Sequence, residues 1–283
     1  MAFRLPFLAR PALDTPAAGP ARPVLDLSGP ALTQAFEALI SGGEEQGGIE
    51  SYATALKSKA ALFEQRLGGG RAAQLDLESF KLICAHIAPA RRRVGAPLER
   101  RGFEFFRAAI AELLDGAEDA TADPRIAAFT ARFPADREHR WVRDLAAELL
   151  HTTYPEPYPL MCRWVWDAAA NTGVLREIWH GEDVDHKTLE VADDHATFLM
   201  LREELSQFLT DNGVFRDLLH YVDLLCAQVY AGYVDSQGGT YLRTDFSSPE
   251  DPMQYTRRLL GLDGLDPRTG RSRFKEAAAE LSH

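Results

Sequence analysis

The sequence lacks long apolar runs and an excess of basic charge. No segment approaches the roughly 18 consecutive apolar residues that span a bilayer. The chain has 42 acidic and 31 basic residues, and the resulting net charge of −11 repels nucleic acid and anionic lipid unless a local patch overrides it. We therefore expect no membrane span and no general affinity for nucleic acid.

Cysteine is scarce, and the usual catalytic motifs are absent. Cys84, Cys162 and Cys226 lie far apart among apolar neighbours, without metal-binding spacing. We expect buried, reduced thiols and a cytoplasmic protein. There is no GxSxG, no GxxxxGK[ST] and no GxGxxG after a strand pattern, so no reaction or cofactor is predicted.

Residues 1–29 are rich in proline and alanine and cannot form a core of their own. We expect a flexible tail, because Pro6 and Pro11 interrupt any signal-like apolar segment. The tail is either a disordered leader or a docking peptide. In the second interpretation Phe3 and Phe7, with nearby arginines, bind a partner protein.

Residues 30–283 predict a single all-α domain, an irregular multi-helix bundle, because helix signals recur with little strand pattern. Val214 to Asp235 is apolar nearly all round, which is typical of a buried helix, and we expect this central helix (about 214–235) to organise the fold. The other expected helices cover about 30–41, 49–67, 76–87, 97–114, 121–133, 136–152, 195–209, 249–259 and 274–281, and residues 171–179 are the most strand-like.

Carboxylate and histidine side chains three residues apart suggest a metal site. Glu148 with His151 and Asp217 with His220 show the i, i+3 spacing that di-iron helical bundles use. On a helical projection Asp217 and His220 point away from the apolar stripe, Glu148 lies at the edge of its own, and His151 lies further out. Salt bridges and hydrogen bonds within each helix are the alternative.

Five arginines fall within eleven positions: Arg91, Arg92, Arg93, Arg100 and Arg101. Guanidinium groups bind phosphates and carboxylates through paired hydrogen bonds, so this cluster predicts an anion or partner site. A solvated helix end is the alternative interpretation.

Two stretches resemble known families. Residues 191–209, VADDHATFLMLREELSQFL, resemble the Asp-His and Met stretch of helical chaperones that bind the twin-arginine leaders of molybdoenzymes, although the preceding glutamate-proline is missing. Residues 147–161, AELLHTTYPEPYPLM, are similar to a turn in helix-hairpin-helix proteins related to DNA glycosylases, without the catalytic lysine and aspartate. Neither resemblance assigns a functional residue to this chain.

The leading hypothesis is a cytoplasmic protein-binding factor that assists the assembly or regulation of an enzyme and has no catalysis of its own. It depends on the missing motifs, the tail and an aromatic loop expected to be exposed, with Tyr154, Tyr158, Trp164 and Trp166. One alternative is a metal-dependent, di-iron-like helical enzyme using Glu148, His151, Asp217 and His220. A weaker alternative is nucleic-acid binding through the arginine cluster.

Overall fold

The computed structural model describes residues 25–44, 47–117, 121–181, 187–237, 253–265 and 271–275. Over these residues the fold is all-α, as the sequence predicts. The α-helices are α1 (Gly29–Glu44), α2 (Ile49–Leu67), α3 (Leu77–Ala85), α4 (Gly95–Arg101), α5 (Phe103–Leu114), α6 (Ala122–Thr130), α7 (Trp141–Thr153), α8 (Val174–Glu177), α9 (His195–Asp211), α10 (Leu218–Gln237) and α11 (Gln254–Leu259). None of them is long and apolar enough to cross a membrane.

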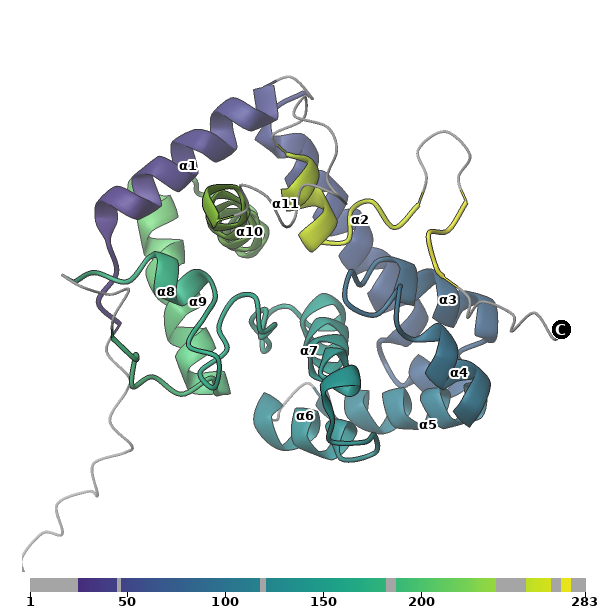
Figure 1. Ribbon diagram of the computed structural model, residues 1–283. Helices are drawn as coiled ribbons and strands as arrows, with labels where there is room; N and C mark the ends of the chain where they lie inside the picture. The colour runs from purple at the N-terminus through teal and green to yellow at the C-terminus, as the bar shows by residue number, and fades with distance from the viewer. Residues whose placement is uncertain are drawn as a thin grey trace, which may run out of the picture.

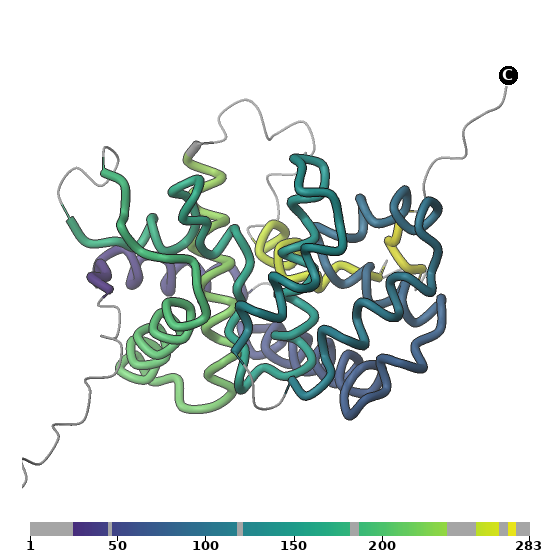
Figure 2. The backbone as a smooth tube through the Cα atoms, turned by 90° about the horizontal axis from the view of Figure 1, so that it is seen from below, coloured from purple at the N-terminus to yellow at the C-terminus, as the bar shows by residue number. Residues whose placement is uncertain are grey.

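The helices form two groups that share α2 (Figure 1). In the first group α10 lies in the middle and contacts α1, α2, α8, α9 and α11. In the second, α7 packs against α2, α5 and α6. In the tube view α2 lies near the centre, between α10 and the helices of the second group (Figure 2), and it contacts both α7 and α10. Side chains that α2, α7 and α10 direct inward can therefore meet where the groups join.

The central helix is present but begins later than its apolar pattern suggests. Its consecutive residues from Tyr221 to Ala227 are buried, as expected for a helix surrounded by others. Val214 to Asp217 instead form a corner after α9, because Gly213 and Asp217 both have positive φ, 88° and 54°. Phe215, which we expected to face inward, is 72% exposed on this corner.

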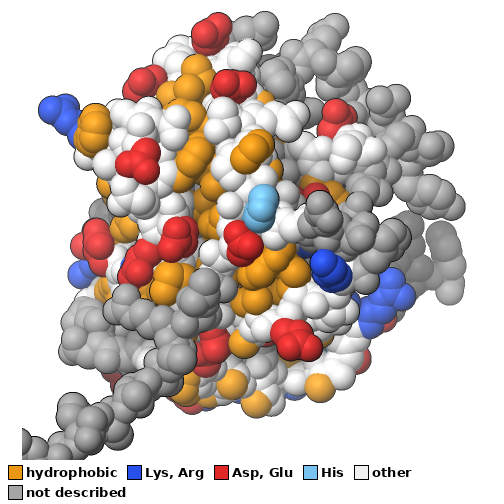
Figure 3. All heavy atoms as spheres, turned by 90° about the vertical axis from the view of Figure 1, so that its left-hand side faces the viewer, with side chains coloured by type: hydrophobic (Ala, Val, Ile, Leu, Met, Phe, Trp, Pro, Cys, Tyr) orange, Lys and Arg blue, Asp and Glu red, His pale blue; other side chains and the backbone are white. Residues whose placement is uncertain are grey.

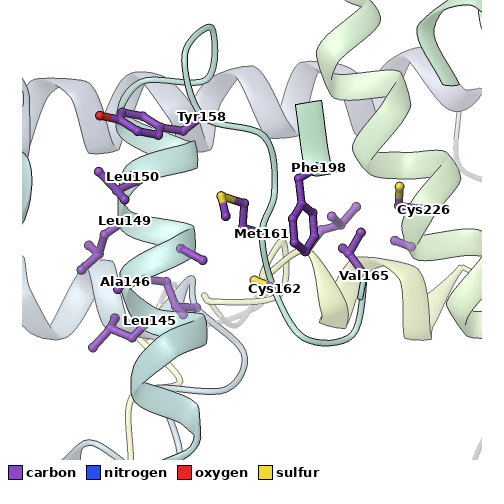
Figure 4. Packing of buried hydrophobic residues seen from close by; sticks show 14 of the residues in the cluster. Leu145, Ala146, Leu149, Leu150, Tyr158, Met161, Cys162, Val165, Phe198 and Cys226 are labelled. Atoms are coloured by element: carbon purple, nitrogen blue, oxygen red, sulfur yellow. The ribbon is translucent and has the colours of Figure 1, made fainter. Parts of the chain in front are cut away.

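The segment after α7 packs into the core between the two groups. In Figure 4, Met161 and Cys162 lie between leucine side chains of α7 on one side and Phe198 and Cys226 on the other. The expected exposed aromatic loop is therefore wrong for Tyr158 and Trp166, which are 1% and 0% exposed. Tyr154 and Trp164 are half-buried. The proline-rich turn directs its rings inward because they supply apolar area that the join between the groups needs.

Several helix boundaries differ from the expected ones for local reasons. Helix α1 continues through Gly42 and Gly43, both buried, which we expected to end it. The predicted helix at 97–114 is divided into α4 and α5 by Gly102, whose φ is 78°. The strand-like stretch contains the short helix α8, and only isolated bridges such as Leu27 with Trp179 pair backbones there. Most of the expected terminal helix at 274–281 lies outside the described residues.

Candidate functional site

Helix α7 places Glu148 and His151 inside the protein. They are 2% and 9% exposed, although their positions on the helical projection placed them at or beyond the edge of the apolar stripe. The reason is that every residue of α7 except Arg143 is buried, because other helices and the chain after α7 surround it. A charged group in such a place must be paired, and both are.

Glu148 is paired with Lys59 of α2. Lys59 Nζ lies 3.0 Å from Glu148 Oε2, and it also donates a hydrogen bond of 2.9 Å to the backbone carbonyl of Leu260, just after α11. Lys59 was missed at the sequence level. A signal existed, since position 59 continues the buried face of α2 formed by Tyr52, Leu56 and Phe63 at helical spacing.

His151 is paired with Asp223 of α10. Its Nε2 lies 2.9 Å from Asp223 Oδ2, and its Nδ1 lies 2.8 Å from the carbonyl oxygen of Tyr158. The Tyr158 carbonyl can only accept, so Nδ1 of His151 carries a proton. The hydrogen bond between Nε2 and the Asp223 carboxylate needs a second proton, carried by either His151 or Asp223. Asp223 was also missed, although an aspartate within the apolar sequence of a central helix indicates a buried partner.

Burial and neighbouring charges shift the pKa values of this cluster. Burial raises the pKa of Glu148, and the nearby Lys59 only partly opposes this. Burial alone would lower the pKa of His151, but the charge of Asp223 and the hydrogen bonds to Asp223 and Tyr158 raise it. Burial lowers the pKa of His220 despite the attraction of Asp223. The cluster therefore favours a protonated His151 beside a neutral His220.

Three of the four predicted metal ligands line one cavity. Glu148, His151 and His220 border a space of about 20 Å³, whereas Asp217 lies on the surface, 3.0 Å from Lys57. Among the described residues, no three His, Cys, Asp or Glu side chains are placed to hold a metal ion. Lys59 neutralises Glu148, and both ring nitrogens of His151 are engaged in hydrogen bonds. The geometry therefore gives the metal hypothesis no support.

The five arginines of the cluster do not form one site. Arg91 is 4% exposed and holds the carboxylate of Asp263 through two hydrogen bonds of 2.6 and 3.0 Å. Arg92, Arg93, Arg100 and Arg101 are exposed. Arg101 donates to the carbonyl of Arg132, and its guanidinium group lies 4.0 Å from the centre of the Phe105 ring. The Arg91 site is thus already occupied by a carboxylate of the same chain.

The face on the left-hand side of Figure 1, away from α4 and its arginines, is not suited to binding nucleic acid. On the face shown in Figure 3, acidic side chains are spread among hydrophobic ones, and basic side chains lie mostly toward the margins. Such a face repels a phosphate backbone.

The corner between α9 and α10, residues 213–217, is the most unusual surface feature; we call it the Phe215 corner. Phe215 is the sole exposed aromatic residue among those the structure describes. Asp217 has a φ of 54°, a conformation that a residue other than glycine rarely adopts, and Lys57 binds its carboxylate at 3.0 Å. Its main-chain carbonyl accepts hydrogen bonds from the amides of His220 and Tyr221. The side chain and the main chain of Asp217 are therefore both fixed by hydrogen bonds, while Phe215 projects into solvent.

The cysteines and the tail residues are the remaining positions that the sequence singled out. Cys84, Cys162 and Cys226 are buried free thiols, as predicted. Phe3 and Phe7 lie outside the described residues. No protein-family model, curated protein or solved structure matches the chain, so its function must be argued from its own residues.

Proposed function

We propose that this protein acts by binding another protein through the Phe215 corner, as an assembly or regulatory factor for an enzyme, without a reaction of its own. The observation that carries the proposal is the 72% exposure of Phe215 on a corner fixed at Gly213 and Asp217. Aromatic side chains often dominate binding energy at interfaces, and a rigid support reduces the entropy lost on binding.

The charged groups of the core support a binding protein more than an enzyme. Lys59, Glu148, His151 and Asp223 each have an internal partner and are less than a tenth exposed. A general acid or base must come within hydrogen-bond distance of its substrate, and here the chain itself occupies most of those positions.

The partner's surface follows from the chemistry of the corner. Phe215 requires an apolar pocket, and the exposed Arg216 beside it favours a carboxylate at the pocket's rim. We therefore propose a folded partner with an acid-rimmed apolar pocket. In cells the protein is expected in the cytoplasm, in keeping with its three reduced thiols.

The N-terminal tail is proposed as a second contact. Phe3 and Phe7 are flanked by Arg4 and Arg10, which suits a peptide that orders on a protein surface. Removal of residues 1–25 is expected to weaken partner binding, and unchanged recovery of the partner would remove the tail from the proposal.

A paired pull-down tests the main contact. Full-length protein is compared with Phe215→Ser and with Leu77→Ser, which changes another exposed apolar side chain, 37% exposed on α3. We expect one partner to be recovered with the wild type and with Leu77→Ser and lost with Phe215→Ser. Equal recovery with both variants would contradict the proposal.

A further inference from the structure

Residues 253–265, which we call the C-terminal strap, cross from the α10 group to the end of α3. The strap begins with α11, where Thr256 donates to the side chain of Gln228 on α10 over 2.9 Å. It continues past Lys59, which holds the carbonyl of Leu260. It ends beside α3 and the turn that follows, where His86 Nδ1 lies 3.1 Å from the carbonyl oxygen of Gly261.

The strap approaches the α3 end too closely for side chains at two positions. A Cβ atom on Gly261 would lie 1.8 Å from the carbonyl oxygen of His86, and the φ of Gly261 is 66°. A Cβ atom on Gly264 would lie 2.7 Å from His86 Nδ1. Glycine is thus required at both positions where the strap passes His86. This close approach leaves the preceding Leu260 with its carbonyl on Lys59.

One ion pair acts as the latch of the strap. Arg91 is 5% exposed at its side chain and binds both oxygens of Asp263, which is 20% exposed. Arg273 adds a longer contact of 3.3 Å to the same carboxylate. Asp263 is partly accessible to solvent, so water can reach its carboxylate when the pair separates, whereas Arg91 stays buried.

The strap forms one wall of a cavity that is lined by an unsatisfied group. Leu259 and Leu260 line the 20 Å³ space together with Lys59 and Glu148. Glu148 Oε2 is bound by Lys59, but Glu148 Oε1 is buried and has no hydrogen-bond partner among the described residues. A buried acceptor without a donor is unfavourable, because it has lost its hydrogen bonds to water without replacement. The cavity therefore offers two groups to a ligand. One is the Lys59 ammonium group, which already donates to a carbonyl, and the other is Glu148 Oε1, which lacks a donor.

We propose that this cavity is a binding site for a primary carboxamide, and that the strap occupies it by placing the protein's own Leu260 carbonyl on Lys59. A primary amide presents a carbonyl and an N–H on the same side, which a trans peptide amide does not. The carbonyl accepts from Lys59, as the Leu260 carbonyl does, and the N–H donates to Glu148 Oε1. The buried Leu260 side chain shows that the site accepts a leucine-sized neighbour.

The strap is suited to leave the cavity. Helix α11 has six residues, too few for a helix that is stable by itself. The strap is held by buried side chains, Met253 and Leu260 among them, and by polar contacts at Lys59, His86 and Arg91. An incoming amide carbonyl can take the place of the Leu260 carbonyl on Lys59. Opening also gives Glu148 Oε1 access to a donor. In the proposed exchange, the carbonyl of Leu260 leaves Lys59 and the carbonyl of the bound amide replaces it.

The test uses the full-length chain and N-acetyl-leucinamide as the probe, with binding followed by NMR. Asp263→Asn weakens the latch outside the cavity. We expect faster hydrogen exchange at the amides of Leu260, Gly261 and Leu262 in this variant and an affinity for the probe raised roughly tenfold over wild type, because the open fraction rises. Arg107→Gln, which breaks an exposed pair with Glu104, is the matched control and should change neither quantity.

Two comparisons make the proposal falsifiable. Methyl 4-methylpentanoate keeps the leucine-like chain and the carbonyl but has no N–H, and it should bind Asp263→Asn far more weakly than the amide does. The double variant Lys59→Met with Glu148→Met should not bind the amide. Equal binding of ester and amide, binding by the double variant, or no saturable binding by Asp263→Asn would overturn the site. Phe215→Ser should bind the probe normally, so failure here is separate from failure of the Phe215 corner.

Discussion

Lys59 and Glu148 are 89 residues apart in the sequence, and their charged atoms lie 3.0 Å apart in the core, where α2 and α7 meet. Two charges inside a protein are costly to desolvate, and each depends on the other. Their pairing fixes the contact between α2 and α7, and the carbonyl of Leu260 binds the same ammonium group.

Removing one member of this pair should cost more than removing both. Lys59→Met leaves Glu148 buried without a counter-ion and is expected to lower the free energy of unfolding by about 3–5 kcal/mol. The double variant Lys59→Met with Glu148→Met should recover most of this loss, since two apolar side chains of similar volume replace the pair. Urea unfolding monitored by circular dichroism measures both. A double variant less stable than the single one would contradict this description of the pair.

The pair of His151 and Asp223 predicts a loss of stability at alkaline pH. The folded-state pKa of His151 is raised above 6.5, so its stabilising contribution is complete below pH 6.5 and is lost as the pH rises through the raised pKa. Asp223→Asn should remove much of this loss, because the new amide donates to a neutral His151 whose Nδ1 proton still binds Tyr158.

The measurement compares unfolding free energies of wild type and Asp223→Asn at about pH 6 and about pH 9. His220 has a lowered pKa, so its stabilising contribution is lost as the pH falls below 6.5, and Glu148, with a raised pKa, loses its contribution as the pH rises from 4.5. Glu148 is the same in both proteins. Asp223→Asn removes an attraction on His220 and lowers its pKa further, which affects stability on the acid side only, so we read the difference between the two proteins on the alkaline side. An equal alkaline loss in the two proteins would show that His151 is not the group responsible.

Gly261→Ala should destabilise the strap through a collision as well as through its backbone angle. The added Cβ would lie 1.8 Å from the carbonyl oxygen of His86, and we expect a loss of more than about 2 kcal/mol. Gly70→Ala is the matched control, since its φ is 79° with open space around the Cβ, and it should cost only about 1–2 kcal/mol. Chemical denaturation measures both, and equal losses would contradict the close contact at His86.

The three cysteines should not react in the folded protein. Burial raises the pKa of Cys84, Cys162 and Cys226, and the thiolate is the reactive form. A colourimetric thiol reagent should detect no free thiol under native conditions and all three in denaturant. Rapid reaction of any one in the native protein would show that the core opens more readily than its burial implies.

The sequence predicts the helices and the central position of α10 because both depend on local periodicity. It predicts Glu148 and His151 as notable residues but not their partners. Lys59 and Asp223 reach them through contacts between helices that are distant in sequence, and no single-helix pattern records such a contact. The strap was missed for the same reason, since Gly261 reads as a turn until His86 is known to lie beneath it.

The exposure of Phe215 was missed because the apolar pattern runs without a break from Val214 into the central helix. What interrupts it is backbone conformation, at Gly213 and at Asp217, where an aspartate adopts a positive φ that sequence alone does not indicate. Functional surfaces are often located where local patterns and tertiary structure disagree, and the Phe215 corner is such a place.

Photo-crosslinking from position 215 tests the central claim most directly. The photoreactive residue p-benzoylphenylalanine replaces Phe215 in one full-length protein and Leu77 in another, and each is irradiated in cells. We predict one dominant crosslinked protein from position 215, the same one that Phe215→Ser fails to recover, and no such product from position 77. No crosslink from position 215, or the same products from both positions, would contradict the claim that the Phe215 corner binds a partner.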